Sequence, residues 1–358
     1  MSRRILIYRL GSIGDTVVAL PALRLIARAF PDAERRLLTT FPGSGRESPV
    51  AGMLAGTGLV HGAIDYRKGE RGLAPLMALR KEIRAFRPDA LIYLAEKRGL
   101  KAAWRDVAFF HACGVPKVIG APVTRARQTY RYDPVTERFE PEAARLARCL
   151  ESLGDARLQD PASWDLALTD EERAEARAAL AGWPGAGRFV AACVGSKIPV
   201  KDWEEANWTR ALGRIGREHP GLGLVFVGAP DDAERSARVA EAWPGPSLDL
   251  CGRLSPRASA AVMAGADLFL GNDGGPMHLA AAVGTPTAVV FAARNLPGVW
   301  FPQGPDHTVL YHRTPCFGCQ LDTCPDYDKM CIRAITPDRL ADAARQRLSP
   351  AARRRDSA

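Results

Sequence analysis

The residues best suited to chemistry lie in two glycine-containing loops, and the first of these loops ends in a carboxylate. It reads Gly11-Ser12-Ile13-Gly14-Asp15 and follows a short apolar run. Glycines let the backbone approach a ligand, and the N-terminus of a following helix attracts negative charge. The carboxylate of Asp15 could take a proton from a hydroxyl as a general base. It could equally cap the following helix, and the sequence leaves both roles open.

The second loop combines two glycines with an acid and a histidine. It contains Asp273, Gly274, Gly275 and His278, with a proline where a helix would begin. Two consecutive glycines leave their N–H groups free to meet a phosphate, and the helix dipole adds attraction. Capping by Asp273 alone would not require the Gly-Gly pair, so this loop predicts a phosphate site. His278 could instead be a structural histidine at the start of the helix.

Alternating strand-like and helix-like segments position both loops. Apolar runs predict strands at 5–10, 36–40, 90–94, 118–120, 189–194, 223–228, 247–250, 267–271 and 287–291. Apolar residues at helical spacing fall between most of these runs. This alternation indicates βαβ units with parallel strands, whose ligands bind beyond the carboxyl ends of the strands. Both loops are expected at such ends.

A break in this pattern near residues 154–161 divides the chain, whose 358 residues favour two domains. We expect Rossmann-like domains at 1–160 and 161–335. A strong helix start at Thr336 makes residues 336–358 a closing helix and a basic tail, which includes Arg353, Arg354 and Arg355. No stretch approaches the roughly 18 apolar residues of a membrane span, and the N-terminus is unlike a signal peptide. We therefore expect a cytoplasmic protein.

The two loops and three further segments resemble glycosyltransferase family 9, the heptosyltransferases. Residues 4–15 and Ala19-Leu-Pro-Ala-Leu23 are similar to the opening of the family, and residues 271–281 with Gly284-Thr-Pro286 are similar to its donor-binding loop. Lys201-Asp-Trp203 with Asn207-Trp208, a closing cysteine-rich segment and Ile335-Thr-Pro337 also match. The similarity keeps its order from residue 3 to residue 345.

The resemblance implies an α/β chain of GT-B type, with two Rossmann-like domains whose parallel sheets face each other across a cleft. The N-terminal domain would hold the acceptor, the C-terminal domain would hold the nucleotide-sugar, and the last helix would pack back towards the N-terminal domain. The family inverts the anomeric centre in a single displacement, which requires no metal cofactor. Asp15 matches the base of the family, and Gly11, Ser12 and Gly14 form the loop before it.

The donor contacts implied by the resemblance all lie in the C-terminal domain. Cationic and N–H groups would stabilise the leaving nucleoside diphosphate, and other residues would hold the ribose, the base and the sugar. The set comprises Ser196, Lys201, Asp232, Leu254, Asp273, Gly274, Gly275 and His278. Gly274-Gly275-Pro276-Met277 departs from the heptose enzymes, so the donor sugar stays open. Arg294 could contact substrate or be solvated.

Acceptor recognition is assigned to four basic residues at loop ends of the N-terminal domain, namely Lys97, Arg98, Arg125 and Arg127. They suit a phosphorylated or acidic glycolipid, although they could also be solvated surface. We expect a monomer that moves heptose from ADP-heptose onto a hydroxyl of a glycan or glycolipid such as the lipopolysaccharide core, at the inner face of the cytoplasmic membrane. Another nucleotide-sugar donor, or a soluble secondary-metabolite acceptor, is the alternative.

Four cysteines crowd into one segment near the end of the chain. Cys316, Cys319, Cys324 and Cys331 have spacings at which four thiolates can surround a structural zinc. The alternative is four reduced thiols in a compact loop. Both interpretations stay open, and neither gives the cysteines a catalytic role.

The composition allows two other classes of protein. A formal net charge of +9 with a knuckle-like cysteine cluster could suit a nucleic-acid binder. No basic stripe interleaved with aromatics occurs, and the charge spreads over both halves, so we expect no nucleic-acid partner. The same fold could also serve a sugar-nucleotide epimerase or hydrolase, which would need no acceptor.

Overall fold

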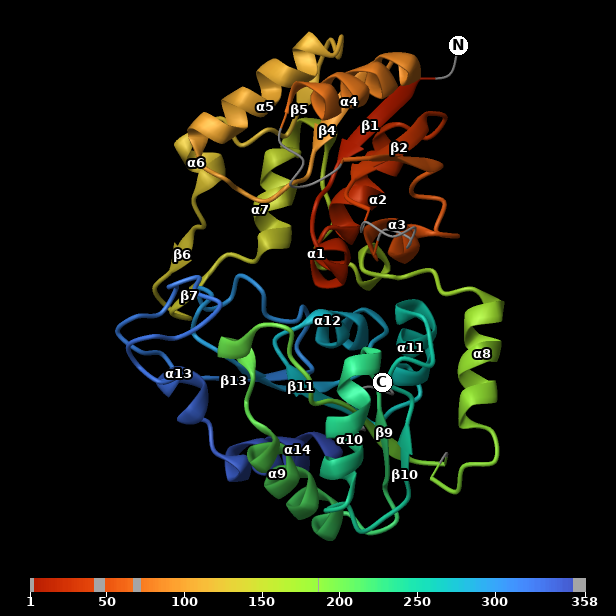
Figure 1. The fold of residues 1–358 in the computed structure, drawn as a ribbon, viewed down its shortest axis with the longest axis vertical. Helices are drawn as coiled ribbons and strands as arrows, with labels where there is room; N and C mark the ends of the chain where they lie inside the picture. The colour runs from red at the N-terminus through yellow and green to blue at the C-terminus, as the bar shows by residue number, and fades with distance from the viewer. Residues whose placement is uncertain (1–2, 42–48, 67–71, 186, 350–358) are drawn as a thin grey trace. The chain divides into compact units, whose positions relative to one another are not determined.

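The computed structural model describes residues 3–41, 49–66, 72–185 and 187–349 and divides them between two compact units, Met1–Ala167 and Leu168–Ala358. The division falls close to the boundary expected at residue 160. Each unit has its own parallel sheet (Figure 1). The tail residues Arg353, Arg354 and Arg355 lie outside the described residues. No helix among the described residues is long and apolar enough to cross a membrane.

The N-terminal unit is a doubly wound α/β domain. Its sheet has the order β3-β2-β1-β4-β5, with all neighbours parallel. The strands are β1 (Arg4–Tyr8), β2 (Glu34–Thr39), β3 (Gly62–Asp65), β4 (Ala90–Tyr93) and β5 (Val118–Ile119). Strands β1 and β4 are buried almost throughout, which explains their continuous apolar runs. The loops after these two strands therefore meet at one edge of the sheet.

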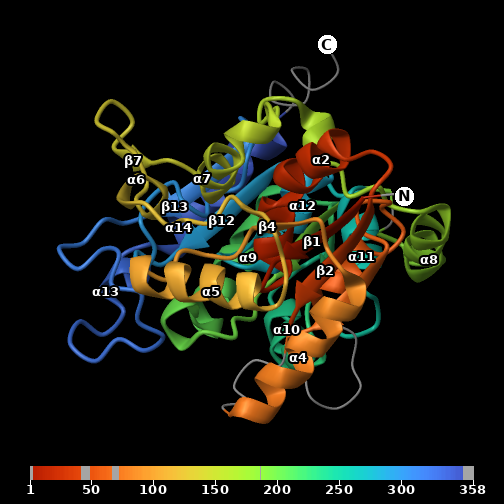
Figure 2. The ribbon, with the colours of Figure 1, turned by 90° about the horizontal axis from the view of Figure 1, so that it is seen from above.

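The helices of this unit join successive strands. They are α1 (Ile13–Val18), α2 (Leu20–Ala29), α3 (Pro49–Leu54), α4 (Leu73–Phe86), α5 (Leu100–Ala112), α6 (Arg125–Gln128) and α7 (Glu142–Cys149). Figure 2 shows α4 and α5 from above. Pro21 lies in the first turn of α2, where its missing N–H costs no helical hydrogen bond. A hairpin of β6 (Tyr132–Asp133) and β7 (Arg138–Phe139) precedes α7.

The C-terminal unit repeats the architecture with a larger sheet of order β10-β9-β8-β11-β12-β13, again all parallel. Its strands are β8 (Phe189–Cys193), β9 (Gly223–Phe226), β10 (Ser247–Asp249), β11 (Leu268–Asn272), β12 (Thr287–Phe291) and β13 (His307–Tyr311). Both sheets have the strand arrangement of a Rossmann-like fold, with a switch point beside the first strand of the unit. The α/β prediction with parallel sheets is confirmed.

The helices of the C-terminal unit form two groups. They are α8 (Asp170–Leu180), α9 (Glu205–Glu218), α10 (Ala233–Ala240), α11 (Pro256–Met263), α12 (Gly275–Ala282), α13 (Met330–Arg333) and α14 (Pro337–Leu348). Helix α9 packs against α10 and α14, whereas α11 packs against α8 and α12. Helix α14 also contacts β11, β12 and β13 of its own unit. Its expected packing towards the N-terminal domain stays a prediction.

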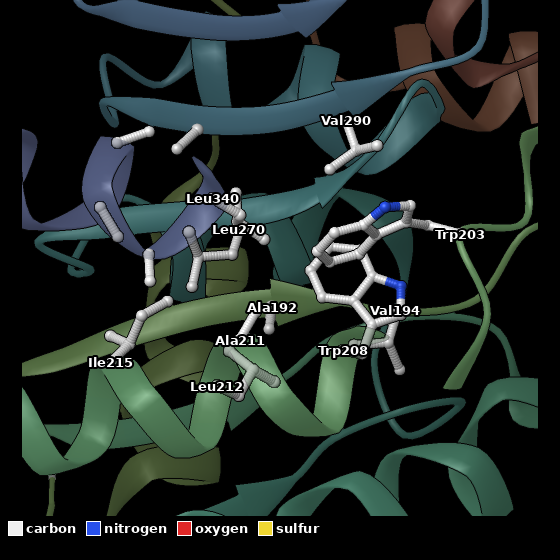
Figure 3. Packing of buried hydrophobic residues seen from close by; sticks show 14 of the residues in the cluster. Ala192, Val194, Trp203, Trp208, Ala211, Leu212, Ile215, Leu270, Val290 and Leu340 are labelled. Atoms are coloured by element: carbon white, nitrogen blue, oxygen red, sulfur yellow. The ribbon is translucent and has the colours of Figure 1, made fainter. Parts of the chain in front are cut away.

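Two tryptophans of the Lys-x-Trp stretch belong to the core of the C-terminal unit. Trp203 and Trp208 are almost fully buried, and their rings meet edge to face at 4.9 Å (Figure 3). The indole N–H of Trp203 donates to the carbonyl of Ile335 at 2.8 Å, which fixes the entry to α14. Burial of the two large indole rings stabilises the unit and holds the neighbouring turn of Lys201 in place.

Candidate functional site

Asp15 folds back over the turn that precedes it in the N-terminal unit. Its Oδ2 accepts hydrogen bonds from the backbone N–H of Ser12 at 2.6 Å and from the Ser12 hydroxyl at 2.7 Å. Gly11 has φ +140°, and a Cβ there would lie 2.7 Å from Asp15 Cβ, so only glycine allows this approach. Gly14 is buried in the first turn of α1. The capping role of Asp15 is therefore present in the structure, and its part in proton transfer stays a prediction.

A buried arginine lies beneath Asp15. Arg9 directly follows β1 and is fully buried, and its guanidinium lies 3.6 Å from Asp15 Oδ1. It also donates to the carbonyl of Asp15 and, at 2.5 Å, to the carbonyl of Leu94 after β4. A buried cation is tolerated when it is paired in this way. Our sequence reasoning missed Arg9, although an arginine directly after an apolar strand was the available signal.

Glu96 is a second carboxyl beside Asp15. It follows β4, whose end adjoins the end of β1, and its side chain shares a hydrogen bond with Asp15. Desolvation of its carboxyl raises the pKa of Glu96, and the charge of Asp15 raises it further. The residue as a whole is nevertheless exposed. Arg9 acts in the opposite direction. Sequence reasoning did not single out Glu96.

Lys97 lies against a buried polar cluster on α7. Its ammonium lies 4.2 Å from the centre of the Tyr130 ring, and the Tyr130 hydroxyl donates to Glu142 at 2.9 Å. Glu142 is fully buried and receives two hydrogen bonds from Arg145, at 2.5 and 2.6 Å. Burial, and then the charge of Arg145, lowers the pKa of Lys97. Lys97 is therefore a partly desolvated cation, which suits an anionic ligand.

The other three basic residues differ in what they contact. Arg98 donates to the Tyr8 hydroxyl at 2.8 Å and to the buried carboxylate of Asp106, so it takes part in the packing of α5. Arg127 donates to the carbonyl of Ala121 at 3.3 Å, and Arg125 is exposed. The acceptor role of these residues remains a prediction. Of the four, Lys97 is the partly desolvated cation that best suits an anionic ligand.

Asp273 and Lys201 form the centre of the site in the C-terminal unit. Lys201 ends a short 3-10 turn (Pro199–Lys201) after β8, and Asp273 follows β11, the neighbouring strand. The Lys201 ammonium lies 2.8 Å from Asp273 Oδ2 and 3.4 Å from the Asp273 carbonyl. The Asp273 side chain is 5% exposed and that of Lys201 is 12% exposed. The structure thus brings together two residues that lie far apart in the sequence.

Gly274 and Gly275 begin α12 directly beside this ion pair. Gly274 has extended backbone, and a Cβ there would meet only Pro276 and Asn272, at 3.8 and 3.9 Å. The fold itself therefore does not require glycine at Gly274, whereas a ligand approaching the N–H groups of α12 would. We expect the positive end of the helix and the Lys201 ammonium to attract an anionic ligand.

Two further predicted donor residues lie at the same edge of the sheet. Asp232 accepts from the N–H of Ala229 at 2.8 Å, so it caps the turn into α10. A Cβ at Gly195 would lie 1.7 Å from its Oδ1, which shows how closely the carboxylate approaches the loop after β8. Ser196 closes that loop by donating to the carbonyl of Ile198 at 3.1 Å. A role of Asp232 towards ribose stays a prediction beside its capping role.

The remaining donor residues flank this edge. Leu254 is half-buried between β10 and α11, and Ser255 caps α11. His278 is buried in the first part of α12, and its ring lies 6.4 Å from that of Trp300. His278 is thus packed as a structural histidine would be. Its contact with a phosphate stays a prediction.

Sequence reasoning missed Asn295, which lies behind Asp273. Asn295 is buried and donates to Asp273 Oδ2 at 2.9 Å. Arg294, left open by the sequence, donates to the carbonyls of Gln320 and Leu321, each at 2.8 Å, and pairs with Asp322. Its side chain is mostly buried, so the structure gives it a loop-bracing role that sequence spacing could not reveal.

The four clustered cysteines differ in exposure. Cys331 is buried, Cys316 and Cys324 are half-buried, and Cys319 is exposed. Among the described residues, no group of three or more histidine, cysteine or acidic side chains is arranged to hold a metal ion. The zinc hypothesis therefore finds no support in this geometry.

Two doubly wound units in one chain, each with its own parallel sheet, have the architecture of a fold of GT-B type. The model of glycosyltransferase family 9 (heptosyltransferase) matches residues 77–328. The chain belongs to this family and is a glycosyltransferase. This assignment favours the transferase over the nucleic-acid binder and the epimerase considered from the sequence.

Similar proteins carry the same description. The chain is 25% identical to lipopolysaccharide heptosyltransferase 1 of Pseudomonas aeruginosa over 339 aligned residues. The aligned region covers 90% of this chain and 87% of the relative. The chain is 33% identical to the Salmonella typhimurium protein of the same name over 99 residues, which are 28% of this chain and 30% of that relative, so this match spans under a third of it. The solved structure of E. coli heptosyltransferase WaaC with ADP-2-deoxy-2-fluoro heptose has a TM-score of 0.62 at 21% identity, over 96% of this chain and 99% of that one. This last likeness shows the fold alone.

Proposed function

We propose that the chain transfers heptose from ADP-heptose to a hydroxyl of a glycan or glycolipid, such as the lipopolysaccharide core, with inversion at the anomeric carbon. The observation that carries the proposal is the Lys201–Asp273 pair at the start of α12, where a cation and free N–H groups converge. Family membership and the names of the relatives support the heptose donor and the lipopolysaccharide acceptor.

On the donor side, the leaving group is a nucleoside diphosphate that gains negative charge as the sugar bond breaks. Lys201 and the N–H groups of Gly274 and Gly275 would meet that charge, because a preorganised cation and helix N-terminus need little reorganisation. Asp273 would hold Lys201 in place and contact the donor sugar. Ser196, Asp232, Leu254 and His278 complete the proposed contacts with phosphate, ribose, base and sugar.

On the acceptor side, Asp15 would remove the proton of the attacking hydroxyl as the new glycosidic bond forms. Arg9 would orient the carboxylate, and Ser12 would hold its Oδ2. Lys97, with Arg98, Arg125 and Arg127 at neighbouring loop ends, would attract the anionic groups of the acceptor. The two products are the lengthened acceptor and ADP, and the proton leaves through Asp15.

No metal cofactor takes part in the proposed mechanism, because Lys201 and the start of α12 supply the positive charge. A structural zinc at the cysteine segment stays a hypothesis. Elemental analysis of reduced, purified protein tests it. One zinc per chain that is lost in Cys316→Ser would support the hypothesis, and fully active zinc-free protein would overturn it.

We also propose that the protein works in the cytoplasm, at the inner face of the membrane that holds its acceptor. The outer face of α4 supports this contact, because Leu73, Leu76 and Met77 are 79%, 45% and 49% exposed. Lys81 and Arg84 follow on the same face at helical spacing and are also exposed. A helix face with an apolar tip and a basic stem suits an anionic lipid surface.

Co-sedimentation with vesicles tests the membrane contact. We expect binding to vesicles with phosphatidylglycerol, weaker binding to pure phosphatidylcholine, and a loss of binding in a Leu76→Ser/Met77→Ser double variant. Leu321→Ser, a similarly exposed leucine of the C-terminal unit, is the matched control. Equal binding by the double variant and the control would contradict a role of α4.

We propose that the protein is a monomer in which the N-terminal domain binds the acceptor and the C-terminal domain binds the donor. Light scattering after size exclusion should give the chain mass of 38.7 kDa. A multiple of that mass at working concentration would contradict the monomer.

An assay of acceptor-dependent ADP release tests the function as a whole. Purified protein is mixed with ADP-heptose and a heptose-deficient lipopolysaccharide core, and the product mass is recorded. We expect release of ADP together with an acceptor that is one heptose heavier. ADP release without any heavier acceptor would instead favour a hydrolase, and activity with only a UDP- or GDP-sugar would overturn the donor.

A further inference from the structure

A buried amide lies directly behind the Lys201–Asp273 pair. Asn295 follows β12, is 6% exposed, and donates its side-chain N–H to Asp273 Oδ2 at 2.9 Å. The same oxygen accepts the Lys201 ammonium at 2.8 Å. Asp273 Oδ2 thus accepts from both the Asn295 amide and the Lys201 ammonium. The amide therefore limits how the Asp273 carboxylate can rotate and where the ammonium can lie.

The orientation of this amide is set by a residue of the cysteine-rich segment. Gln320 donates from its side-chain nitrogen to Asn295 Oδ1 at 3.3 Å and to the carbonyl of Arg294 at 2.8 Å. Because Asn295 Oδ1 accepts from Gln320, its nitrogen must face Asp273. The hydroxyl of Tyr311 donates to the Asn295 carbonyl at 3.2 Å and fixes the backbone.

Backbone hydrogen bonds hold Gln320 in this position. Its own N–H donates to the carbonyl of Arg294 at 3.0 Å, and the N–H of Gly318 donates to the carbonyl of Ala293 at 2.7 Å. The Arg294 guanidinium in turn donates to the carbonyl of Leu321 at 2.8 Å. The cysteine-rich segment is therefore bound along the loop that carries Asn295.

We propose that Asn295 is a positioning residue of the donor site, which holds Asp273 and through it Lys201, and that Gln320 orients the Asn295 amide. This inference rests on the proposed donor function. It gives the segment around Gln320 a part in donor binding that requires no metal. Neither residue needs to touch the donor, because both act through the shared carboxylate.

Asn295→Asp is the sharpest test, because its effect should depend on pH. When the new carboxyl is ionised, it cannot donate to Asp273 and repels it; when protonated, it can donate again. Burial and the charge of Asp273 should raise the pKa of the new carboxyl, with the charge of Lys201 opposing this rise. We expect the Kd for ADP, measured by calorimetry, to rise about tenfold over wild type at about pH 8 and to approach wild type at about pH 5.5.

The pH dependence separates positioning from a structural role. Both proteins are titrated well below their melting temperatures at each pH, so that a loss of stability alone leaves the ratio of the two Kd values unchanged with pH. A flat ratio, or a Kd equal to that of wild type at every pH, would overturn the proposal. Any effect of pH on ADP itself cancels, because both proteins meet the same ligand.

Two variants of the cysteine-rich segment test the role of Gln320. Gln320→Ala should raise the Kd for ADP about threefold, since it loosens the amide without removing it. Leu321→Ala is the matched control, because its side chain is exposed and only its carbonyl braces Arg294. Equal Kd values for the two variants would overturn the orienting role.

A ligand-free measurement distinguishes this inference from the proposed function. If Asn295 faces Asp273, the melting temperature of Asn295→Asp should fall further below wild type as pH rises, because a folded-state pKa above the unfolded one loses stability with rising pH. Wild-type protein that binds no nucleotide would overturn the proposed function. A constant difference in melting temperature would overturn the contact itself.

Discussion

The two candidate sites use the same kind of ion pair in opposite ways. In the N-terminal unit the cation is the hidden partner, since the Arg9 side chain is 0% exposed and that of Asp15 is 15% exposed. In the C-terminal unit the carboxylate is the more hidden partner, since Asp273 is 5% exposed and Lys201 is 12% exposed. The N-terminal site thus presents a carboxylate, and the C-terminal site presents a cation.

Under the proposed function, we expect each unit to serve one half of the transfer reaction. A presented carboxylate can accept a proton from a nucleophile, whereas a presented cation can stabilise a diphosphate leaving group. In each site the buried partner fixes the presented one, because an unpaired buried charge would be costly. Variants of the presented groups should therefore affect chemistry, and variants of the hidden groups should affect stability and orientation.

The largest effect is expected at the presented carboxylate. Asp15→Asn removes the proposed proton acceptor but can still cap α1, so it should lower kcat by about 10²–10⁴-fold with little change in donor affinity. Steady-state kinetics with ADP titration as the control measures both quantities. Near wild-type turnover would assign Asp15 to capping alone.

The presented cation should come next. Lys201→Ala removes the charge proposed to face the diphosphate, so it should lower kcat/KM by about 10²–10³-fold. Lys197→Ala, four residues earlier and exposed, is the matched control and should leave kcat/KM unchanged. If both variants lost activity equally, the loss could not be ascribed to the pair with Asp273.

The hidden cation should matter mainly for stability. Arg9→Met leaves the carbonyls of Asp15 and Leu94 without their donor, so it should reduce the free energy of unfolding by about 1–3 kcal/mol. Urea unfolding measures this, with Arg125→Met, an exposed arginine of the same unit, as the control. A double variant with Asp15→Asn should lose less than the sum of the single losses. Strict additivity would show that the pair is not coupled.

The smallest effect concerns pH. The pKa of Glu96 is raised in the folded chain above its value of about 4.3 in the unfolded chain. Between these two pKa values, the folded chain holds one more proton on Glu96 than the unfolded chain does. The free energy of unfolding contributed by Glu96 therefore falls as pH rises through this window. Glu96→Gln should remove that fall and move the acidic limb of the kcat/KM profile to lower pH, because Asp15 loses a neighbouring carboxyl. The exposed Glu137→Gln should leave the profile unmoved.

The sequence predicted the parts of the fold whose signal is local. Buried parallel strands appear as continuous apolar runs, and the loops after β1 and β11 carry glycines beside a helix start. It did not predict β3 and β13, which are edge strands and are less buried. Helix α8 was also missed, because its residues are mostly charged or alanine and only Ala176 is buried.

The site was predictable only as far as single loops allow. Asp15, Lys201 and Asp273 were singled out from the sequence because they lie in or near glycine-rich or family-like segments, and their roles stay predictions. Arg9, Glu96, Asn295 and Gln320 were not found, because their roles depend on contacts between strands that are distant in sequence; Arg9 binds a carbonyl 85 residues away. Such contacts are created by the order of strands in the sheet, which alternation alone does not specify.

The donor site at the start of α12 is tested most directly by titrating wild-type protein and Lys201→Ala with ADP, UDP and GDP by calorimetry. We expect ADP to bind wild-type protein in preference to UDP and GDP, and we expect this binding to be lost in Lys201→Ala. Equal binding of ADP by both proteins would contradict the donor site at the start of α12, and no binding of any nucleotide by wild-type protein would contradict the transferase function proposed here.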